Sequence, residues 1–390
     1  MKSLLNFVEK IKPTFSKGGK LSFLHSTFDA FETFLFVPNT VTKSGAHIRD
    51  CVDLKRVMTI VIIALMPALA FGIWNVGEQH SIAFGLDMSF IEKVWFGLLK
   101  VLPLIIVSYV VGLGIEFISA QLRGHEVNEG YLVSGMIIPL IMPVDVPLWI
   151  LALAVAFAVI IGKEVFGGTG MNIWNPALLT RAFLFFSYPS RMSGDTVWTG
   201  GVTRYMAEGQ AWQAGNGLVD GFSGATPLAD ATLANLEPKF LDMVLGTIPG
   251  SVGETSVIAI LIGAIILIWT GVASWKIMAS SVIGGLAIGY LGYAAGATDL
   301  PGYYQLVMGG FLFGTVFMAT DPVTSAQTEC GKWIYGFLVG ALAVTVRIWN
   351  PGYPEGMMLA ILLMNTFAPI IDHYVIEGSI KRRAKKVNIA

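Results

Sequence analysis

Long apolar stretches separated by short polar turns fill most of the chain from residue 57 onward. A helix needs about 20 mostly apolar residues to cross a bilayer, and ten stretches are long or apolar enough to lie in one. They are residues 57–76, 95–118, 131–142, 146–162, 176–188, 257–273, 275–295, 303–319, 333–349 and 356–376. The pattern predicts an all-α polytopic membrane protein with about ten transmembrane helices.

Two of these stretches are shorter than a full span and contain or adjoin proline. Residues 131–142 include Pro139 and are followed by Pro143, and residues 176–188 begin at Pro176. Proline lacks the backbone donor that continues a helix, so these helices are expected to be short or broken. Helices of that kind tend to line binding sites in membrane transporters.

The second half of the chain repeats features of the first half at a fixed offset. IWNP occurs at residues 173–176 and again at 348–351, and at the same offset DVP at 145–147 meets TDP at 320–322. Chance similarity is the alternative, but together with the aligned apolar stretches the matches predict two five-helix repeats. Five is an odd number, so the repeats are expected to be inverted, with binding sites at their interface.

Lysine and arginine concentrate at the two ends of the chain. Residues 1–56 contain nine of them, and residues 377–390 include the run KRRAKK. Because basic residues flank the cytoplasmic ends of spans, both termini are expected in the cytoplasm, which requires an even number of crossings. Residues 57–189 and 257–376 then form the two repeats, and the acidic loop of residues 190–256 lies outside.

The N-terminal region resembles neither a cleaved signal peptide nor a span. It has no uninterrupted apolar core followed by a small-residue cleavage site, so it is expected to stay attached. Residues 21–37 are rich in phenylalanine and mildly acidic. This segment is expected to lie along the cytoplasmic membrane surface or to pack on a partner subunit.

The composition agrees with a membrane protein, since 54% of the residues are hydrophobic and 13% are charged, against about 25% charged in soluble domains. A net charge of -1 gives no field for nucleic acid. Cys51 and Cys330 form no CxxC pair, and the five histidines form no zinc set. No disulfide framework, iron–sulfur cluster or metal site is expected on this chain alone.

The outer loop contains a peptide rich in small residues, DGFSGAT at residues 220–226. Its members Asp220, Gly221, Ser223, Gly224 and Ala225 precede Thr226. Such a sequence lets an enzyme hold an extended backbone and reach the threonine hydroxyl. On that chemistry alone, a Gly/Ser/Thr-rich loop is usually an ordinary turn.

DGFSGAT is similar to the flavinylation motif, in which a flavin transferase attaches flavin mononucleotide (FMN) from FAD to the last residue through a phosphoester. Four more stretches, at residues 47–58, 125–136, 162–189 and 246–256, extend the resemblance over essentially the whole chain. The chain thus resembles the B-subunit family of sodium-translocating NADH:quinone reductases. The D subunits of Rnf ferredoxin:NAD reductases share the flavin threonine but typically lack the N-terminal extension.

The resemblance implies one subunit of a six-subunit complex in the bacterial inner membrane, coupling NADH:ubiquinone reduction to Na⁺ transport. It implies FMN on Thr226, a noncovalent riboflavin and ubiquinone as the electron acceptor. Asn172 and Asn175 are assigned to the riboflavin by the resemblance, since their amides suit a flavin edge; a helix cap is the alternative. The chain has no GxGxxG after a strand, so another subunit is expected to bind NADH.

The remaining candidate residues lie in or near the expected spans. Gly112 matches a family glycine near the quinone, whereas its neighbour Leu113 departs from the glycine pair of that position. Glu116 and Asp372 are candidate Na⁺ ligands, because intramembrane carboxylates are costly; carboxylates reaching water at a helix end are the alternative. Arg181 is expected to balance a carboxylate or a flavin.

Two other functions stay open on these residues. A secondary transporter or channel without redox work fits inverted repeats and buried carboxylates equally well. An Rnf-type subunit keeps the flavin and loses the quinone. A flavin on Thr226 distinguishes the redox functions from the transporter.

Overall fold

The computed structural model describes residues 2–15, 54–123, 130–194, 196–203, 224–229, 239–350 and 355–387, with a few isolated residues between 19 and 45. Within these ranges the chain is helical and contains no strand. In this described part of the chain, six helical stretches are long and apolar enough to cross a membrane. They are α3 (Leu54–Phe84), α4 (Phe90–Arg123), α6 (Leu148–Gly162) together with the following turn η2 (Glu164–Phe166), α12 (Trp275–Ala294), α15 (Glu329–Trp349) and α16 (Gly356–Val387). The predicted all-helical membrane class is confirmed.

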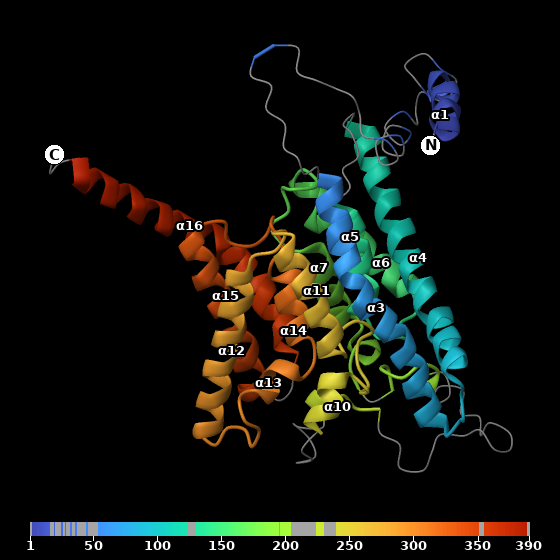
Figure 1. The fold of residues 1–390 in the computed structure, drawn as a ribbon, viewed down its shortest axis with the longest axis vertical. Coiled ribbons are helices and arrows are strands. Elements are labelled where there is room, and N and C mark those ends of the chain that lie inside the picture. Colours follow the sequence, from blue (N-terminus) through green and yellow to red (C-terminus); the bar gives the residue numbers. More distant parts are fainter. Residues whose placement is uncertain are drawn as a thin grey trace.

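Shorter helices are also present, most of them within the bundle, while α1 lies apart from it (Figure 1). Three of them are apolar, namely α5 (Tyr131–Leu140), α7 (Pro176–Ser187) and α11 (Val257–Trp269). The others are α1 (Lys2–Phe15), η2 (Glu164–Phe166), η3 (Pro189–Arg191), α10 (Phe240–Leu245), α13 (Tyr304–Val307), α14 (Phe311–Phe313) and the π-helical turn η4 (Gly314–Met318). The two short helices predicted from proline positions, α5 and α7, are both present.

Polar side chains fix where three of the helices begin. The Asn175 side chain accepts hydrogen bonds from the first backbone N–H groups of α7. Ser256 does the same for α11, and Thr328 for α15. Each cap satisfies a donor that has no partner inside the helix and would be costly in a membrane.

The eighth expected span, residues 303–319, is not one continuous helix. It is broken into α13, α14 and η4, with Met308 extended and Gly309 at a φ of +56°. A positive φ is easily adopted only by glycine, so Gly309 permits the break. In contrast, α16 continues to Val387, well past residue 376 where the span was expected to end.

Close helix contacts in the second half depend on small residues. A side chain at Gly284 of α12 would meet the backbone carbonyl of Phe337 in α15, and one at Gly340 would meet that of Ser281. Small residues let helix backbones approach each other where apolar lipid supplies no driving force for association.

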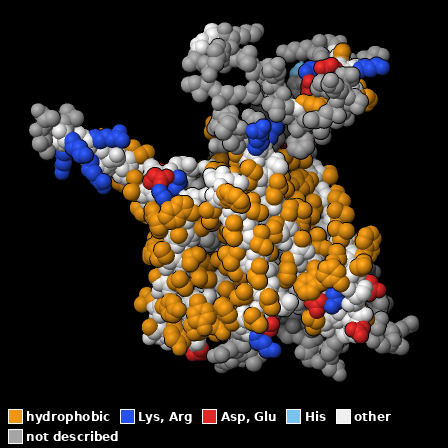
Figure 2. Space-filling model, viewed as in Figure 1, with side chains coloured by type: hydrophobic (Ala, Val, Ile, Leu, Met, Phe, Trp, Pro, Cys, Tyr) orange, Lys and Arg blue, Asp and Glu red, His pale blue; other side chains and the backbone are white. Residues whose placement is uncertain are grey.

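The two described ends of the chain lie at the same end of the bundle (Figure 1). Hydrophobic side chains cover the middle of the visible face, while charged side chains gather at its two ends and along the projecting part of α16 (Figure 2). An apolar belt between charged ends is the surface that a bilayer requires.

Loops and broken helices meet inside the bundle. The Leu140 carbonyl at the end of α5 accepts a hydrogen bond from Gly253 N at 2.7 Å. Nearby, the Ser251 hydroxyl donates to the Ile141 carbonyl at 3.3 Å. The loop before α11 therefore satisfies backbone groups that the end of α5 leaves free, as irregular backbone inside a membrane protein must.

Candidate functional site

Thr226 lies at the wall of a cavity formed by both halves of the chain, which we call the Thr226 cavity. Of the predicted motif the structure describes Gly224, Ala225 and Thr226, whereas Asp220, Gly221 and Ser223 lie outside the described residues. The Thr226 hydroxyl oxygen lies 3.4 Å from the N–H of Ala229 and accepts from it. The other polar residues lining the cavity are Arg181, Ser251, Glu254, Thr255, Arg347 and Glu355.

Arg181, on α7, is paired with carboxylates in this cavity. Its Nη2 and Nε lie 2.6 and 3.2 Å from Oε2 of Glu355. Its Nη1 lies 3.9 Å from Oε1 of Glu254 and donates to the Ser251 hydroxyl at 3.2 Å. The expectation that Arg181 balances a carboxylate is confirmed.

The Glu254 carboxylate packs against the backbone of Gly310. A side chain at Gly310 would meet its carboxylate, so glycine is what gives Glu254 room. Burial raises the pKa of the Glu254 carboxyl, and the neighbouring Arg181 guanidinium opposes that rise. Glu254 and Glu355 both escaped the sequence analysis, because neither lies in an apolar stretch.

Arg347 is a second guanidinium in the cavity, and the sequence analysis missed it. It is only 4% exposed, and its Nη1 donates to the Gln305 carbonyl at 2.7 Å. Its guanidinium carbon lies 5.7 Å from the centre of the Phe311 ring. Two signals were available, since Arg347 falls inside an apolar span and occupies the position that corresponds to Asn172 in the sequence repeat.

The segment of residues 196–203 closes one side of the Thr226 cavity with Trp198, which is 7% exposed. Side chains from the first half hold this segment in place. The His80 Nδ1 lies 2.7 Å from the Gly200 carbonyl, and Asp145 Oδ2 accepts from Gly201 N at 2.6 Å. The indole is thus positioned by contacts that hold the backbone just after it.

Asn175 lines a different cavity, which we call the Asn175 cavity. The other residues lining it are Val57, Met58, Val61, Gly130, Val133, Ser134, Ile137, Leu267, Val272, Ala273, Phe317, Thr320, Asp321 and Pro322. The Asn175 amide donates to Asp321 Oδ2 at 3.3 Å, and the same oxygen accepts from the Thr324 hydroxyl at 3.1 Å. Among the described residues Asn175 but not Asn172 lines it, and Asn172 donates to the Trp174 carbonyl at 3.1 Å.

The glycine-rich loop before α7 folds as a series of tight turns. Gly167, Gly168 and Gly170 have φ angles of +120°, +95° and +89°. Residues with a side chain would be strained in these backbone conformations. The turns bring Asn172 into a buried position and lead into the cap formed by Asn175.

Gly112, the candidate quinone residue, lies against an aromatic side chain. A Cβ at this position would overlap the Tyr131 ring from α5. The Tyr131 hydroxyl donates to the Ser108 carbonyl of α4 at 3.0 Å. The space beside Gly112 is therefore filled by α5, while Leu113 packs against the core.

Glu116 forms a buried ion pair with Lys163 at the end of α6. Both residues are nearly inaccessible, Glu116 being 4% exposed. The next residue, Glu164, binds Ser119 and lies 3.6 Å from the Arg123 guanidinium. Lys163 thus compensates the charge of Glu116 inside the protein.

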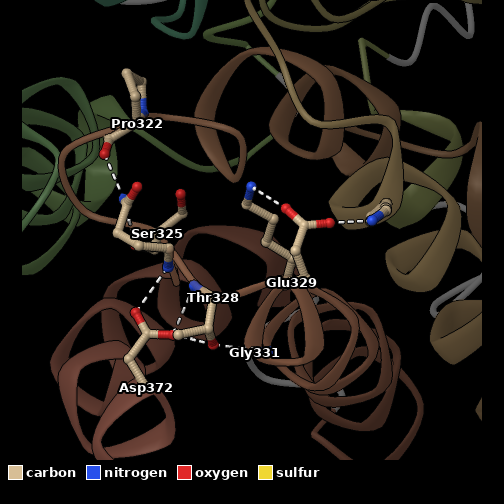
Figure 3. A network of polar contacts seen from close by, with 9 residues as sticks. Pro322, Ser325, Thr328, Glu329, Gly331 and Asp372 are labelled. Carbon is tan, nitrogen blue, oxygen red and sulfur yellow. Dashed lines mark hydrogen bonds and ion pairs between the residues drawn. The ribbon is translucent and has the colours of Figure 1, made fainter. Parts of the chain in front are cut away.

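Asp372 accepts three hydrogen bonds from the start of α15 (Figure 3). The donors are Gln327 N at 2.7 Å, Thr328 N at 3.0 Å and the Thr328 hydroxyl at 2.6 Å. Glu329, drawn beside it, pairs instead with Lys276 and Lys332. Asp372 and Glu116 therefore lie in separate polar clusters, and the structure does not bring them together.

The chain is similar to known proteins over nearly all of its length. Residues 41–381 match the profile of the NQR2, RnfD, RnfE family. The B subunit of the Na(+)-translocating NADH-quinone reductase of Pseudomonas paraeruginosa is 42% identical, over 97% of this chain and 98% of the relative. The same subunit of Chromohalobacter salexigens is 42% identical over 98% and 96%, and that of Azotobacter vinelandii 41% over 97% and 98%.

Proposed function

Because the chain belongs to the NQR2, RnfD, RnfE family, we propose that it is the membrane subunit through which a sodium-translocating NADH:quinone reductase passes electrons to ubiquinone. It is a multi-pass membrane protein and works within a multi-subunit complex. The three relatives reported above are B subunits, which favours this function over that of an Rnf D subunit.

The proposed topology has ten crossings in two inverted five-helix repeats, residues 57–189 and 257–376. Residues 1–56 and 377–390 are cytoplasmic, in a bacterial inner membrane, and the loop of residues 190–256 is outside. The position of both described chain ends at one end of the bundle supports an even number of crossings (Figure 1). Coupling to Na⁺ then uses the two repeats to alternate access between the sides.

The Thr226 cavity is the observation that carries the proposal. We propose that a flavin transferase moves FMN from FAD to the Thr226 hydroxyl, forming a phosphoester and releasing AMP. A bound flavin exchanges electrons singly or in pairs, which suits a relay to a two-electron quinone. The lining fits such a group, because Trp198, Met357 and Met358 supply apolar walls and Arg347 supplies a donor.

A second flavin, riboflavin without covalent attachment, is proposed at the Asn175 cavity. Its lining is mostly apolar, with Asn175, Thr320 and Asp321 as polar groups, a mixture typical of sites for flat cofactors. The positive-φ glycines at 167, 168 and 170 permit close approach to the backbone. In this arrangement Asn175 orients the ring edge and Asn172 stabilises the loop.

Ubiquinone is proposed to bind near Gly112, in the second half of α4. The Tyr131 ring fills the space beside Gly112. The quinone ring is therefore expected to contact Tyr131 and not the backbone of Gly112. Glu116 and Asp372 are the proposed Na⁺ ligands. For Glu116 this requires Na⁺ to replace the Lys163 ammonium, since that group now occupies its carboxylate.

Peptide mass spectrometry of the purified complex tests the flavin on Thr226. The peptide covering residues 220–239 is expected to carry the FMN mass and in-gel fluorescence, and Thr226→Val is expected to lose both. Thr270→Val is the matched control, because its hydroxyl bonds only the end of its own helix. Flavin-free peptide from cells that express the transferase would instead favour a transporter without redox work.

Sodium titration of quinone reduction tests the carboxylates. Glu116→Gln and Asp372→Asn are each expected to raise the Na⁺ concentration that gives half-maximal turnover. Glu377→Gln is the control, since Glu377 forms an exposed pair with Lys381. Unchanged Na⁺ dependence in both variants would leave Glu116 and Asp372 with structural roles only. Reduction of ubiquinone, without need of ferredoxin, separates this function from that of an Rnf subunit.

A further inference from the structure

Buried polar atoms without partners cluster at the Thr226 cavity. Six buried side-chain atoms of the described residues have no hydrogen-bond partner, and three of the six are Arg347 Nε, Thr255 Oγ1 and Gln305 Oε1. Arg347 and Thr255 both line the cavity, and Gln305 is bonded to Arg347 through its backbone carbonyl. Folded proteins rarely leave such groups unsatisfied, so their concentration here indicates a ligand.

The geometry of Arg347 leaves one edge of its guanidinium available. Nη1 donates to the Gln305 carbonyl, so the Nε and Nη2 edge remains with two parallel N–H groups. A Cβ on Gly309 would lie 3.3 Å from Nη2 and 3.3 Å from Leu228 Cδ2. The free edge therefore lies close to the side chain of Leu228, in the turn that begins at Thr226.

Among the described residues Arg347 has no ion-pair partner, and the carboxylates of Glu254 and Glu355 in the same cavity attract it only from beyond ion-pair distance. Arg181 is paired with Glu355, but no carboxylate of the described residues forms an ion pair with Arg347. A guanidinium buried in a membrane protein is costly unless an anion accompanies it. A paired N–H edge matches two oxygens of a phosphate group better than any other common anion except a carboxylate.

The sequence repeat gives an independent contrast. Arg347 corresponds to Asn172 in the repeat, because each of them directly precedes a copy of IWNP. The first repeat thus carries a neutral amide where the second carries a permanent positive charge. Riboflavin, proposed near the first position, has no phosphate, whereas FMN, proposed near the second, has one.

We propose that the Nε and Nη2 edge of Arg347, assisted by the Thr255 hydroxyl, binds the phosphodiester that joins the flavin to Thr226. This inference rests on the proposed function. Arg347 makes and breaks no covalent bond. It holds the singly charged phosphodiester, and thereby keeps the attached flavin against the apolar wall of the cavity, away from water.

Quenching of the flavin fluorescence by acrylamide tests this in the purified complex. Acrylamide is uncharged, so its access reports docking and is unaffected by the charge of residue 347. Arg347→Gln is expected to retain FMN by mass while its quenching rises severalfold; Arg347→Lys, which keeps a charge but not the paired edge, is expected to be intermediate. Thr255→Val is expected to give a smaller rise. Arg123→Gln, which changes a half-exposed guanidinium elsewhere, is the control.

The outcomes separate this inference from the proposed function. A parent complex without FMN on the 220–239 peptide overturns the proposed function. A parent with FMN, and an Arg347→Gln variant with unchanged quenching, overturns the role of Arg347 alone. If Arg347→Gln does not assemble, Arg347→Lys and Thr255→Val decide, and unchanged quenching in both overturns the proposal. An assembled Arg347→Gln complex that has lost FMN, regained in Arg347→Lys, supports it.

Discussion

The Thr226 cavity and the Asn175 cavity share two helical elements, α7 and η4, but differ in charge. α7 contributes to both, with Asn175 at its start and Arg181 further along, and the π-helical turn η4 contributes Phe317 to one and Met318 to the other. The Thr226 cavity contains two arginines and two glutamates. The Asn175 cavity has Asp321 as the single charged residue of its lining, among the residues that the structure describes. One scaffold therefore supports two different electrostatic environments.

The repeat makes this contrast visible at single positions. Gly135 and Gly310 are related by the same offset as the two IWNP copies, and both permit close packing. A side chain at Gly135 would meet the Tyr109 ring, whereas one at Gly310 would meet the Glu254 carboxylate. Neighbouring side chains leave no room for a Cβ at either position, and those side chains are aromatic in one half and charged in the other.

The largest predicted effect comes from breaking the charge network of the Thr226 cavity. Arg181→Met leaves the Glu355 and Glu254 carboxylates, whose side chains are only 22% and 13% exposed, without their main counterion. Losing one partner of a buried pair typically costs about 3–5 kcal/mol, so a strongly lowered thermal midpoint of the purified complex is expected.

Arg123→Met is the control for this loss. Arg123 also contacts a glutamate, but its side chain is 43% exposed, so the pair is worth at most about 1 kcal/mol. Equal thermal midpoints for Arg181→Met and Arg123→Met would contradict the view that the buried ion pairs of the Thr226 cavity stabilise the protein.

The repeat-related glycines give the second prediction. Gly135→Ala forces a methyl group against the Tyr109 ring, with a Cβ-to-Cε1 distance of 2.8 Å if nothing moves. Overpacking of this kind costs about 1–3 kcal/mol, measurable as a lower thermal midpoint. Gly310→Ala is expected to cost a similar amount and also to displace Glu254, which changes the visible spectrum of the nearby flavin.

Gly114→Ala is the control for both glycines, because a Cβ there meets no atom within 4 Å. In a helix, alanine is favoured over glycine by about 1 kcal/mol, so this variant is expected to be as stable as the parent or slightly more so. Equal changes in the visible flavin spectrum of Gly135→Ala and Gly310→Ala would contradict the view that only Gly310 affects the flavin through a neighbouring charge.

The sequence predicted the helices better than the interior. Apolar length and proline located the short α5 and α7, and Pro176 marks the start of α7 in the structure as it does in the sequence. The break at Gly309 was missed, because glycine is common inside membrane helices and only tertiary contacts decide whether one interrupts the helix.

The site was predictable where chemistry is local and missed where it depends on contacts between halves. Thr226 was found from a contiguous motif. Lys163 follows α6 in the sequence, yet it is buried against Glu116 from another helix. Arg347 and Glu355 line the same cavity as Thr226 only because the chain folds back on itself. No spacing in the sequence indicated that these residues lie close to Thr226.

The smallest predicted effect concerns the Asn175 cavity. Asn175→Ala removes the cap of α7 and the donor to Asp321, and losing a helix cap costs about 1 kcal/mol. Asn175→Asp keeps an oxygen that caps α7, and its charge suits a helix start. However, it places a second carboxylate beside Asp321, where the amide nitrogen now lies 3.3 Å from Oδ2.

The two substitutions therefore separate capping from ligand binding in a cavity that has little charge of its own. Asn175→Asp is expected to lower the content of extractable riboflavin more than Asn175→Ala does, although it retains the cap. The double variant Asn175→Asp with Asp321→Asn restores one amide and one carboxylate in reversed order, and is expected to recover much of the riboflavin. If riboflavin content instead follows thermal stability across all three variants, Asn175 acts only as the cap of α7. The Asn175 cavity would then lack the flavin-binding side chain proposed for it.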